Sequence, residues 1–312
     1  MIQVVPYKPS YQNLWNEFIA SSKNGVFLFY RNYMDYHADR FTDHSLMFYK
    51  DDRLIGVMPG NIEDDQLISH GGLTFGGIIS DNKMKTTLML ELFETLRIYL
   101  SSIGIKQIIY KAIPHIYHQV PAEEDLYALF LHKAKLYRRD VSSTISPATK
   151  MRLSKGRKWA IKRAAKNAVQ VKRSYEFETF IAIEEQYLLD KHHKKPVHTA
   201  AEIQMLVDRF PNNIKLFATY KDETMLGGVI IYESERVAHA QYIAASDDGK
   251  EMSALDAIMD FLINDYYRDK TYFDFGISTD QDGQYLDVGL VANKESFGAR
   301  TTVYDFYKID LV

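Results

Sequence analysis

The sequence of 312 residues contains no cysteine, and no apolar run approaches the roughly 20 residues that a membrane-spanning helix needs. The absence of cysteine excludes a disulfide framework, a thiol nucleophile and a cysteine-ligated zinc site. The first residues, MIQVVPYKPS, lack a basic segment followed by an apolar one, so no secretory signal peptide is predicted. We therefore expect a cytoplasmic protein with no membrane span.

Several catalytic signatures are also missing. There is no Walker loop, no G-x-S-x-G elbow and no G-x-G-x-x-G motif after a predicted strand. Nucleotidase, serine hydrolase and dinucleotide-enzyme functions therefore have no support. His192, His193 and His198 lie among lysines, with only Asp190 close by, so a divalent cation would be repelled. We expect no metal site.

The patterns that are present indicate an internal duplication. Residues 214–276 read as three strands, a polar loop, a helix and a further strand, and the same order occurs earlier, from about residue 44 to residue 114. The turn at Tyr49-Lys50-Asp51 aligns with the turn at Tyr220-Lys221-Asp222. The later helix has its apolar residues at the spacing of one helical face: Leu255, Ile258, Met259, Leu262, Ile263 and Tyr266.

A basic segment separates the two repeats. Residues 150–173 contain ten Lys or Arg and no acid, so with a net charge of −3 the rest of the chain carries −13. Four lysines are predicted on one helical stripe: Lys155, Lys158, Lys162 and Lys166. This stripe can be the solvated face of a linker, can neutralise phosphates of a nucleotide-linked or CoA donor, or can contact tRNA.

Three stretches resemble a known superfamily. They are the basic helix within 152–173, the strand Y-F-D-F-G at 272–276, and the turn K-E-S-F-G at 294–298. Together they resemble the Fem-type acyl and aminoacyl transferases, which are built from tandem GNAT-like units. The resemblance implies an α+β fold of two such units, each a mixed, mainly antiparallel sheet flanked by helices. It implies an N-terminal GNAT-like domain at 1–145, a basic linker helix at 146–175 and a catalytic C-terminal domain at 176–312.

The same resemblance implies an N-acyltransferase. An acyl group would pass from an acyl-CoA or similar thioester, held where two neighbouring strands splay apart, to an amine that attacks directly. Two alternatives stay open, a peptidoglycan-bridge aminoacyltransferase that uses aminoacyl-tRNA and a non-catalytic module that binds a ligand or RNA. The acyl group, the acceptor and the oligomeric state are not indicated by the sequence.

GNAT enzymes that use acetyl-CoA usually have the pattern Q/R-x-x-G-x-G/A before a helix. The loop before the predicted helix that contains Leu255 and Tyr266 departs from this pattern. It carries one glycine and three acids between residues 246 and 253, and acids there repel a pyrophosphate. Binding of acetyl-CoA in the usual pose is therefore in doubt. The residues that we expect to contact a cofactor in this loop are Ser246, Gly249, Lys250 and Ser253.

Three residues are the predicted catalytic groups. The resemblance places Lys294 at a lysine that contacts substrate, where it would polarise the acyl carbonyl; an exposed turn lysine is an equal alternative. Asp274, inside an apolar strand, is either a base or substrate anchor or a structural acceptor of hydrogen bonds. Tyr242 is expected to offer a hydroxyl to the acceptor. His239, three residues earlier, should then face the opposite side of the strand.

Four further residues are predicted to contact substrate. Glu233 ends a strand at a position where GNAT enzymes often keep an acid, although a solvated turn glutamate is the alternative. His193 is expected in a loop at the mouth of the cleft. Phe297 and Arg300 lie in and just after the turn that resembles the family.

Overall fold

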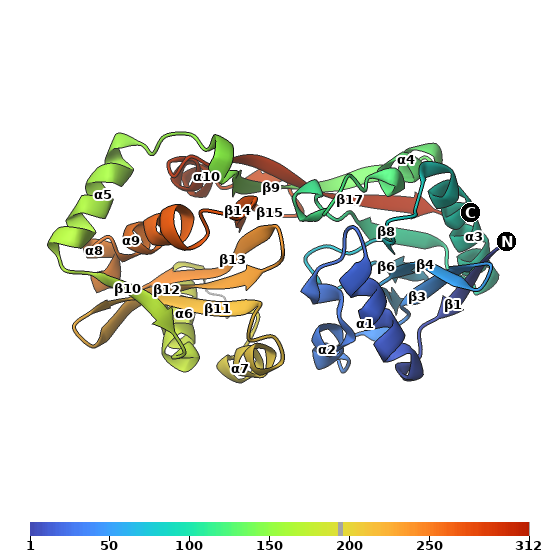
Figure 1. Cartoon of the computed structure of the whole chain (residues 1–312), viewed down its shortest axis with the longest axis horizontal. Helices are drawn as coiled ribbons and strands as arrows, with labels where there is room; N and C mark the ends of the chain where they lie inside the picture. The colour runs from blue at the N-terminus through green and yellow to red at the C-terminus, as the bar shows by residue number, and fades with distance from the viewer. Residues whose placement is uncertain (193–195, 312) are drawn as a thin grey trace. The chain divides into compact units, whose positions relative to one another are not determined.

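The computed structural model describes residues 1–192 and 196–311, and the chain forms two compact units (Figure 1). Unit 1 consists of residues 1–141, 279–285 and 303–312. Unit 2 consists of residues 142–278 and 286–302. Each unit has its own hydrophobic core.

The two units alternate along the chain, which differs from the contiguous domains predicted at 1–145, 146–175 and 176–312. The segment predicted as a separate linker lies within unit 2. It contains a short 3₁₀ helix (Pro147–Thr149), α5 (Lys155–Lys166) and β10 (Gln170–Ser174). Because β10 pairs with β11, the segment supplies the edge strand of the sheet in unit 2.

Unit 2 has a mixed, mainly antiparallel sheet in the order β10-β11-β12-β13-β14-β9. The only parallel pair in this series is β13 with β14. In Figure 1, α9 covers one face of these strands, and α6 and α7 cover the other. The elements are α6 (Phe177–His192), α7 (Ala200–Arg209), β11 (Ile214–Lys221), β12 (Thr224–Glu233), β13 (Val237–Ala245), α8 (Asp247–Glu251), α9 (Ala254–Phe261), a π-helical turn (Leu262–Tyr266), β14 (Tyr272–Ile277) and α10 (Val288–Glu295).

The predicted apolar face of the helix after β13 packs on the sheet. Ile258, Met259, Leu262 and Ile263 are almost fully buried and form one cluster with the inward side chains of the strands. Burial of such side chains contributes about 1.5–3 kcal/mol each. The face therefore anchors the helix that follows β13 against the centre of the sheet.

Strands β13 and β14 separate after a short region of pairing. Their parallel ladder joins Val237 to Tyr272 and ends at the pair His239 and Asp274. Beyond this point β13 continues to Ala245 along β12, whereas β14 continues to Ile277 beside β9. This separation of neighbouring strands is the feature that positions the candidate site.

A β-bulge in β13 changes which side chains share a face. Ile230 pairs with Tyr242 and Tyr232 pairs with His239, while Gln241 is the extra residue between them. Ile230 and Tyr232 are two residues apart and point to the same side, so Tyr242 and His239 also share a face. The expectation that they face opposite sides is wrong, because simple alternation does not hold across a bulge.

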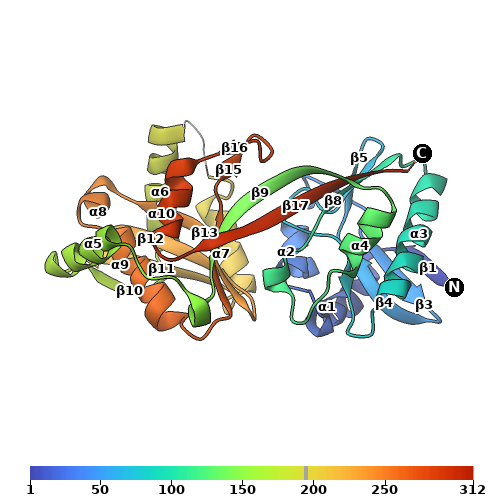
Figure 2. The same cartoon turned by 90° about the horizontal axis from the view of Figure 1, so that it is seen from above.

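Unit 1 has two groups of strands, β1-β3-β4-β7 and β9-β17-β8-β6-β5-β2. Its helices include α3 and α4, which lie next to each other in Figures 1 and 2. The elements are β1 (Ile2–Pro6), α1 (Gln12–Ser21), α2 (Arg31–Met34), β2 (Thr42–Asp43), β3 (Leu46–Lys50), β4 (Arg53–Met58), β5 (Asn61–Glu63), β6 (Gln66–Ile68), β7 (Ile79–Ser80), α3 (Thr86–Ser102), β8 (Gln107–Lys111), α4 (Glu124–Leu131), β9 (Lys135–Ile145) and β17 (Arg300–Asp310). The short strands β15 (Thr279–Asp280) and β16 (Tyr285–Leu286) pair between β14 and α10.

The order of elements supports the predicted duplication. In each unit an antiparallel hairpin, β3–β4 or β11–β12, pairs with a further strand, β7 or β13, which is followed by helix and then by another strand. Unit 1 differs in having β5 and β6 between β4 and β7. Each hairpin also has a register irregularity at the same place, immediately before Tyr49 in unit 1 and before Tyr220 in unit 2. The predicted α+β fold of two tandem units with mixed sheets is confirmed.

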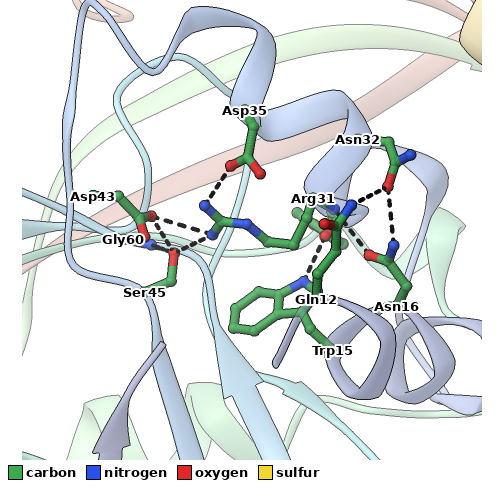
Figure 3. A network of polar contacts seen from close by, with 10 residues as sticks. Gln12, Trp15, Asn16, Arg31, Asn32, Asp35, Asp43, Ser45 and Gly60 are labelled. Carbon is green, nitrogen blue, oxygen red and sulfur yellow. Dashed lines mark hydrogen bonds and ion pairs between the residues drawn. The ribbon is translucent and has the colours of Figure 1, made fainter. Parts of the chain in front are cut away.

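A buried arginine organises the start of unit 1 (Figure 3). Arg31 is 4% exposed, and its guanidinium contacts the carboxylates of Asp35 and Asp43 and donates to Ser45 Oγ at 3.0 Å. Its Cζ lies 4.0 Å from the centre of the Tyr7 ring. The network ties α2 to the strands that follow it, so we interpret Arg31 as a structural residue of unit 1.

Candidate active site

A cavity of about 350 Å³ lies in unit 2, among the segments that follow the separation of β13 and β14. The end of β13, the start of α9 and one face of α10 supply most of its walls. Its lining is largely apolar and includes four charged side chains. The lining residues are Arg157, Tyr187, Ile243, Ala244, Ala245, Gly249, Lys250, Ser253, Ala254, Leu255, Asp256, Met259, Phe275, Leu290, Asn293, Lys294 and Phe297.

Lys294 lies in this wall and is not an exposed turn residue. Helix α10 begins after Asp287, whose side chain accepts from the backbone N–H of Leu290. Lys294 is only 4% exposed, and Nζ donates to the carbonyl oxygens of Gly276 and Ile277, both at 2.8 Å. An ammonium has three N–H donors, so one is left for a group in the cavity. Burial lowers the pKa of Lys294 to about 8, and nearby carboxylates oppose this shift.

Asp274 is fully buried and does not line the cavity. Its Oδ1 accepts from Ser142 Oγ at 2.5 Å, from Thr144 Oγ1 at 3.1 Å and from the N–H of Gly276 at 3.3 Å. Its Oδ2 lies 2.8 Å from Nδ1 of His239. The carboxylate is therefore held by several donors, and it also orients a histidine.

His239 was not among the predicted site residues. It is 14% exposed and stands at the last pair of the β13–β14 ladder. A Cβ added to Gly276 would lie 3.3 Å from its Cε1 and 3.9 Å from its Nε2, so the ring packs over a bare backbone. The signal that could have found it is a histidine in the strand beside the aspartate of the F-D-F-G segment.

Tyr242 is buried and does not line the cavity. Its hydroxyl contacts Nδ1 of His198, and the two rings meet edge to face with centroids 5.9 Å apart. His198 directly precedes the Thr199 cap of α7. Tyr242 and His239 thus share a face of the sheet, the one on which Tyr242 contacts His198 next to α7.

Glu233 lies outside the cavity lining and is held by several partners. Its carboxylate pairs with Lys215 at 2.6 Å and Lys270 at 2.9 Å, and it accepts from the Tyr267 hydroxyl at 3.0 Å. Burial alone would raise the pKa of Glu233, but its hydrogen bonds with the two lysines lower the pKa overall. A carboxylate stabilised in its ionised form by two cations is a weak base, and this arrangement suits a structural ion pair.

The other predicted substrate contacts fall in different places. Phe297 lines the cavity at 3% exposure, and the guanidinium carbon of Arg157 lies 4.1 Å from the centre of its ring. Arg300 is exposed, donates to the carbonyl of Ala299 and is not part of the lining. His193 lies outside the described residues.

The predicted cofactor loop folds as the short helix α8. Ser246 caps α8 by accepting from the N–H of Gly249, and Gly249, Lys250 and Ser253 line the cavity. A Cβ at Gly249 would lie 2.2 Å from the carbonyl oxygen of Leu226, so this position requires glycine for packing. The three acids of the loop, Asp247, Asp248 and Glu251, are exposed and lie outside the lining.

Basic side chains outnumber acidic ones in the lining of the cavity, although Lys250 also pairs with Asp247 at 2.7 Å. Arg157, Lys250 and Lys294 line it, with Asp256 as the single carboxylate. Asp256 is paired with Arg157. The first residues of α9, Ala254 and Leu255, also form part of the wall, so the positive end of the helix dipole lies there. The arrangement favours an anionic or strongly polarised ligand beside an apolar surface.

Neither a metal-binding cluster nor a membrane-spanning helix is found among the described residues. Within 1–192 and 196–311, no group of three or more histidine, aspartate or glutamate side chains is arranged to hold a metal ion. In the same part of the chain, no helix combines the length and apolar character needed to cross a membrane. The cytoplasmic location expected from the sequence stays a prediction.

Comparison with known proteins finds similar domains and similar folds. Residues 149–285 match the family model described as an acetyltransferase (GNAT) domain. No curated protein matches the sequence significantly. Among solved structures, FemX superposes with a TM-score of 0.67 at 11% identity, over 97% of this chain and 96% of FemX.

Two other structures are similar over almost their whole length. L-PGS from Bacillus licheniformis has a TM-score of 0.63 at 12% identity, covering 96% of this chain and 91% of that one. A tandem GNAT protein from the clavulanic acid biosynthesis pathway has a TM-score of 0.52 at 7% identity, covering 100% and 99%. Residues 149–285 are thus similar to a GNAT acetyltransferase domain, and the chain has the fold of these structures.

Proposed function

We propose that unit 2 transfers an acyl group from an activated donor, such as an acyl-CoA or similar thioester, to an amine. The observation that carries the proposal is Lys294, a buried ammonium whose remaining N–H donor is available to the cavity. The amine attacks the acyl carbonyl directly, and the Lys294 ammonium stabilises the negative charge that develops on the carbonyl oxygen. A peptidoglycan-precursor amine, as the FemX-like fold suggests, is one acceptor class.

The lining supports a donor with an apolar acyl chain and a phosphate-bearing carrier. Phe275, Leu290 and Met259 offer an apolar surface, whereas Lys250 and the first turn of α9 offer positive charge. The acids of the α8 segment, which argued against acetyl-CoA, are exposed and outside the lining. One of these acids, Asp247, forms an ion pair with Lys250 at 2.7 Å, so its charge is compensated within the loop.

The test is turnover of a series of acyl-CoA thioesters with a primary amine. Thiol release is followed colorimetrically, and the amide product is identified by mass spectrometry. We expect amide formation by the wild-type protein and a fall of about 10²–10³ in kcat for Lys294→Gln. Absence of amide with every thioester contradicts the thioester donor.

A second candidate is an aminoacyl-tRNA donor, and helix α5 is the observation that favours it. Lys155, Lys158, Lys162 and Lys166 are all exposed on α5, and Trp159, which is 62% exposed, stands among them. No carboxylate partner of these four lysines is found in the described part of the chain. A basic surface with an exposed aromatic ring suits a nucleic-acid backbone and its bases.

Binding of unacylated tRNA at increasing salt tests this candidate. A nucleic-acid contact through several lysines makes the logarithm of the binding constant fall linearly with the logarithm of salt. We expect Lys158→Glu with Lys162→Glu to reduce that slope, whereas two substitutions on unit 1, Lys83→Glu and Lys85→Glu, leave it unchanged. Binding that is absent at low salt, or unchanged in the α5 variant, contradicts a role for α5 with tRNA.

A further inference from the structure

Unit 2 contains a histidine–carboxylate pair outside the lining of the cavity. His239 Nδ1 lies 2.8 Å from Oδ2 of the fully buried Asp274. The other oxygen of Asp274 is occupied by Ser142, Thr144 and the Gly276 N–H. This carboxylate cannot turn without losing several hydrogen bonds, so it fixes the imidazole ring in one orientation.

The carboxylate also determines which ring nitrogen carries the proton. An ionised carboxylate only accepts hydrogen bonds, so Nδ1 of His239 must donate. In the neutral ring the lone pair is then on Nε2, which has no hydrogen-bond partner in the part of the chain that the structure describes. A histidine with Nδ1 bound to a carboxylate and Nε2 free has the arrangement of a general base.

The pair stands next to the proposed reaction centre. His239 and Asp274 form the last pair before β13 and β14 separate. The His239 ring packs over Gly276, and the carbonyl of Gly276 accepts from Lys294 at 2.8 Å. Gly276 therefore lies between Nε2 of His239 and the ammonium of Lys294.

The face of the sheet gives the direction from which the acceptor comes. Because of the bulge at Gln241, His239 shares a face with Tyr242. That face is covered by α6 and α7, and α9 lies on the other (Figure 1). The donor cavity includes the start of α9, so donor and base reach the opening between the strands from its two sides.

We propose that His239 is the general base that deprotonates the acceptor amine, positioned by Asp274. The proposal rests on the acyl transfer proposed above. Its substrate class is an amine that is protonated at neutral pH, since only such an acceptor needs a base before it can attack.

With a thioester donor, protons and electrons balance in the following way. Nε2 of His239 takes one proton from the ammonium of the acceptor, and the free amine forms a C–N bond with the acyl carbon. The C–S bond then breaks with its electron pair on sulfur. The second proton lost from nitrogen goes to that sulfur, which leaves as a thiol, and His239 releases its proton to solvent.

His239→Gln tests the proposal with two acceptors of different protonation. A primary alkylamine is protonated at neutral pH, whereas hydroxylamine is not. With a thioester that the wild-type protein turns over, we expect a loss of about 10²–10⁴ in kcat for the alkylamine. For hydroxylamine the loss is expected to be only a few-fold. Asp274→Asn, which reverses the hydrogen bond to Nδ1, should show the same acceptor-dependent pattern.

A control variant separates a base from a structural histidine. His118→Gln removes another buried histidine, which lies in unit 1 and bonds to the Ile113 carbonyl, and it should affect both acceptors equally or not at all. Equal losses for both acceptors in His239→Gln, or no loss with the alkylamine, overturn the role of His239 and leave acyl transfer in place. If the wild-type protein turns over no thioester with either acceptor, the proposed function and this inference both fall.

Discussion

His239 and Lys294 lie on either side of the same glycine. The imidazole of His239 packs against the Cα side of Gly276, and the ammonium of Lys294 donates to the Gly276 carbonyl at 2.8 Å. Gly276 has a φ of +75°, which places it in the region that side chains with a Cβ rarely adopt. The proposed base and the proposed hydrogen-bond donor to the acyl oxygen thus both contact Gly276.

Gly276→Ala should therefore affect activity more than stability. The new Cβ is strained by the positive φ, at a cost of about 1 kcal/mol, and would lie 3.3 Å from His239 Cε1. We expect at least a tenfold fall in kcat. Gly104→Ala is the matched control, because Gly104 has a φ of +85° and no atom within 4 Å of the added Cβ. Similar melting temperatures with equal activity in both variants would contradict the placement of His239.

Lys294→Met separates catalysis from stability. Methionine retains the length of the side chain and removes a buried ammonium whose desolvation is unfavourable, but it leaves the carbonyls of Gly276 and Ile277 without their donor. These effects oppose each other, so we expect a small change in melting temperature and a fall in kcat of about 10² or more. Circular dichroism melts and initial rates provide the two measurements. Full activity in a folded Lys294→Met protein would exclude the lysine from the mechanism.

The activity should fall as the pH rises through about 8. Burial lowers the pKa of Lys294 to about 8, so the ammonium that donates to the acyl oxygen is lost above that value. The pH dependence of kcat at saturating donor and acceptor is the measurement. Lys294→Gln keeps an N–H donor that does not titrate, so its lower rate should lack this alkaline decrease. The same alkaline decrease in both proteins would assign it to another group.

The stability of the wild-type protein relative to Lys294→Met should rise with pH. Below a pH of about 8 the lysine is charged in the folded and the unfolded state, and the folded state bears the cost of burial. Between about 8 and the ordinary lysine pKa, the unfolded chain binds more protons, so the free energy of unfolding increases with pH. Each tenfold difference in proton affinity between the folded and unfolded states corresponds to about 1.4 kcal/mol. Urea denaturation at pH 7 and pH 10 measures the increase, and a constant difference would contradict the burial of a charged Lys294.

Lys250→Glu should weaken binding of an anionic donor. Lys250 lines the cavity and its ammonium lies 5.1 Å from the ring of Tyr187, which also lines it. We expect the KM for acyl-CoA to rise by about tenfold, an effect of about 1.4 kcal/mol, with little change in kcat. Lys221→Glu, at an exposed position on β11 outside the cavity, is the matched control. An equal effect of both substitutions would indicate a general influence of net charge.

Much of the fold could be predicted because its signals are local. The apolar period of residues 255–263 and the repeated hairpin turns at Tyr49 and Tyr220 depend on neighbours in sequence, and the structure shows the expected helix and hairpins. The assignment of 279–285 and 303–312 to unit 1 depends on contacts distant in sequence. No local sequence pattern predicts that these two segments belong to unit 1 while the residues between them belong to unit 2.

The candidate site could be predicted only in part, because several of its contacts also join residues that are distant in sequence. Lys294 and Phe297 could be singled out because they occur in a recognisable turn, and the structure brings both to the cavity. His239 is missed because simple alternation along the strand predicts that it faces away from Tyr242. The bulge at Gln241 brings the two side chains to the same face. From the sequence, Glu233 is either a substrate contact or a solvated turn glutamate, because its two lysine partners are distant in sequence: Lys215 lies on β11 and Lys270 precedes β14.

The most direct test of the proposed acyl transfer is the initial rate of thiol release from a series of acyl-CoA thioesters with a primary alkylamine, compared between the wild-type protein and Lys294→Met. We expect amide formation by the wild-type protein and a rate lower by about 10² or more in the variant. Equal rates in the two proteins, or no amide from any thioester, would contradict the proposed role of Lys294 and of the cavity that it lines.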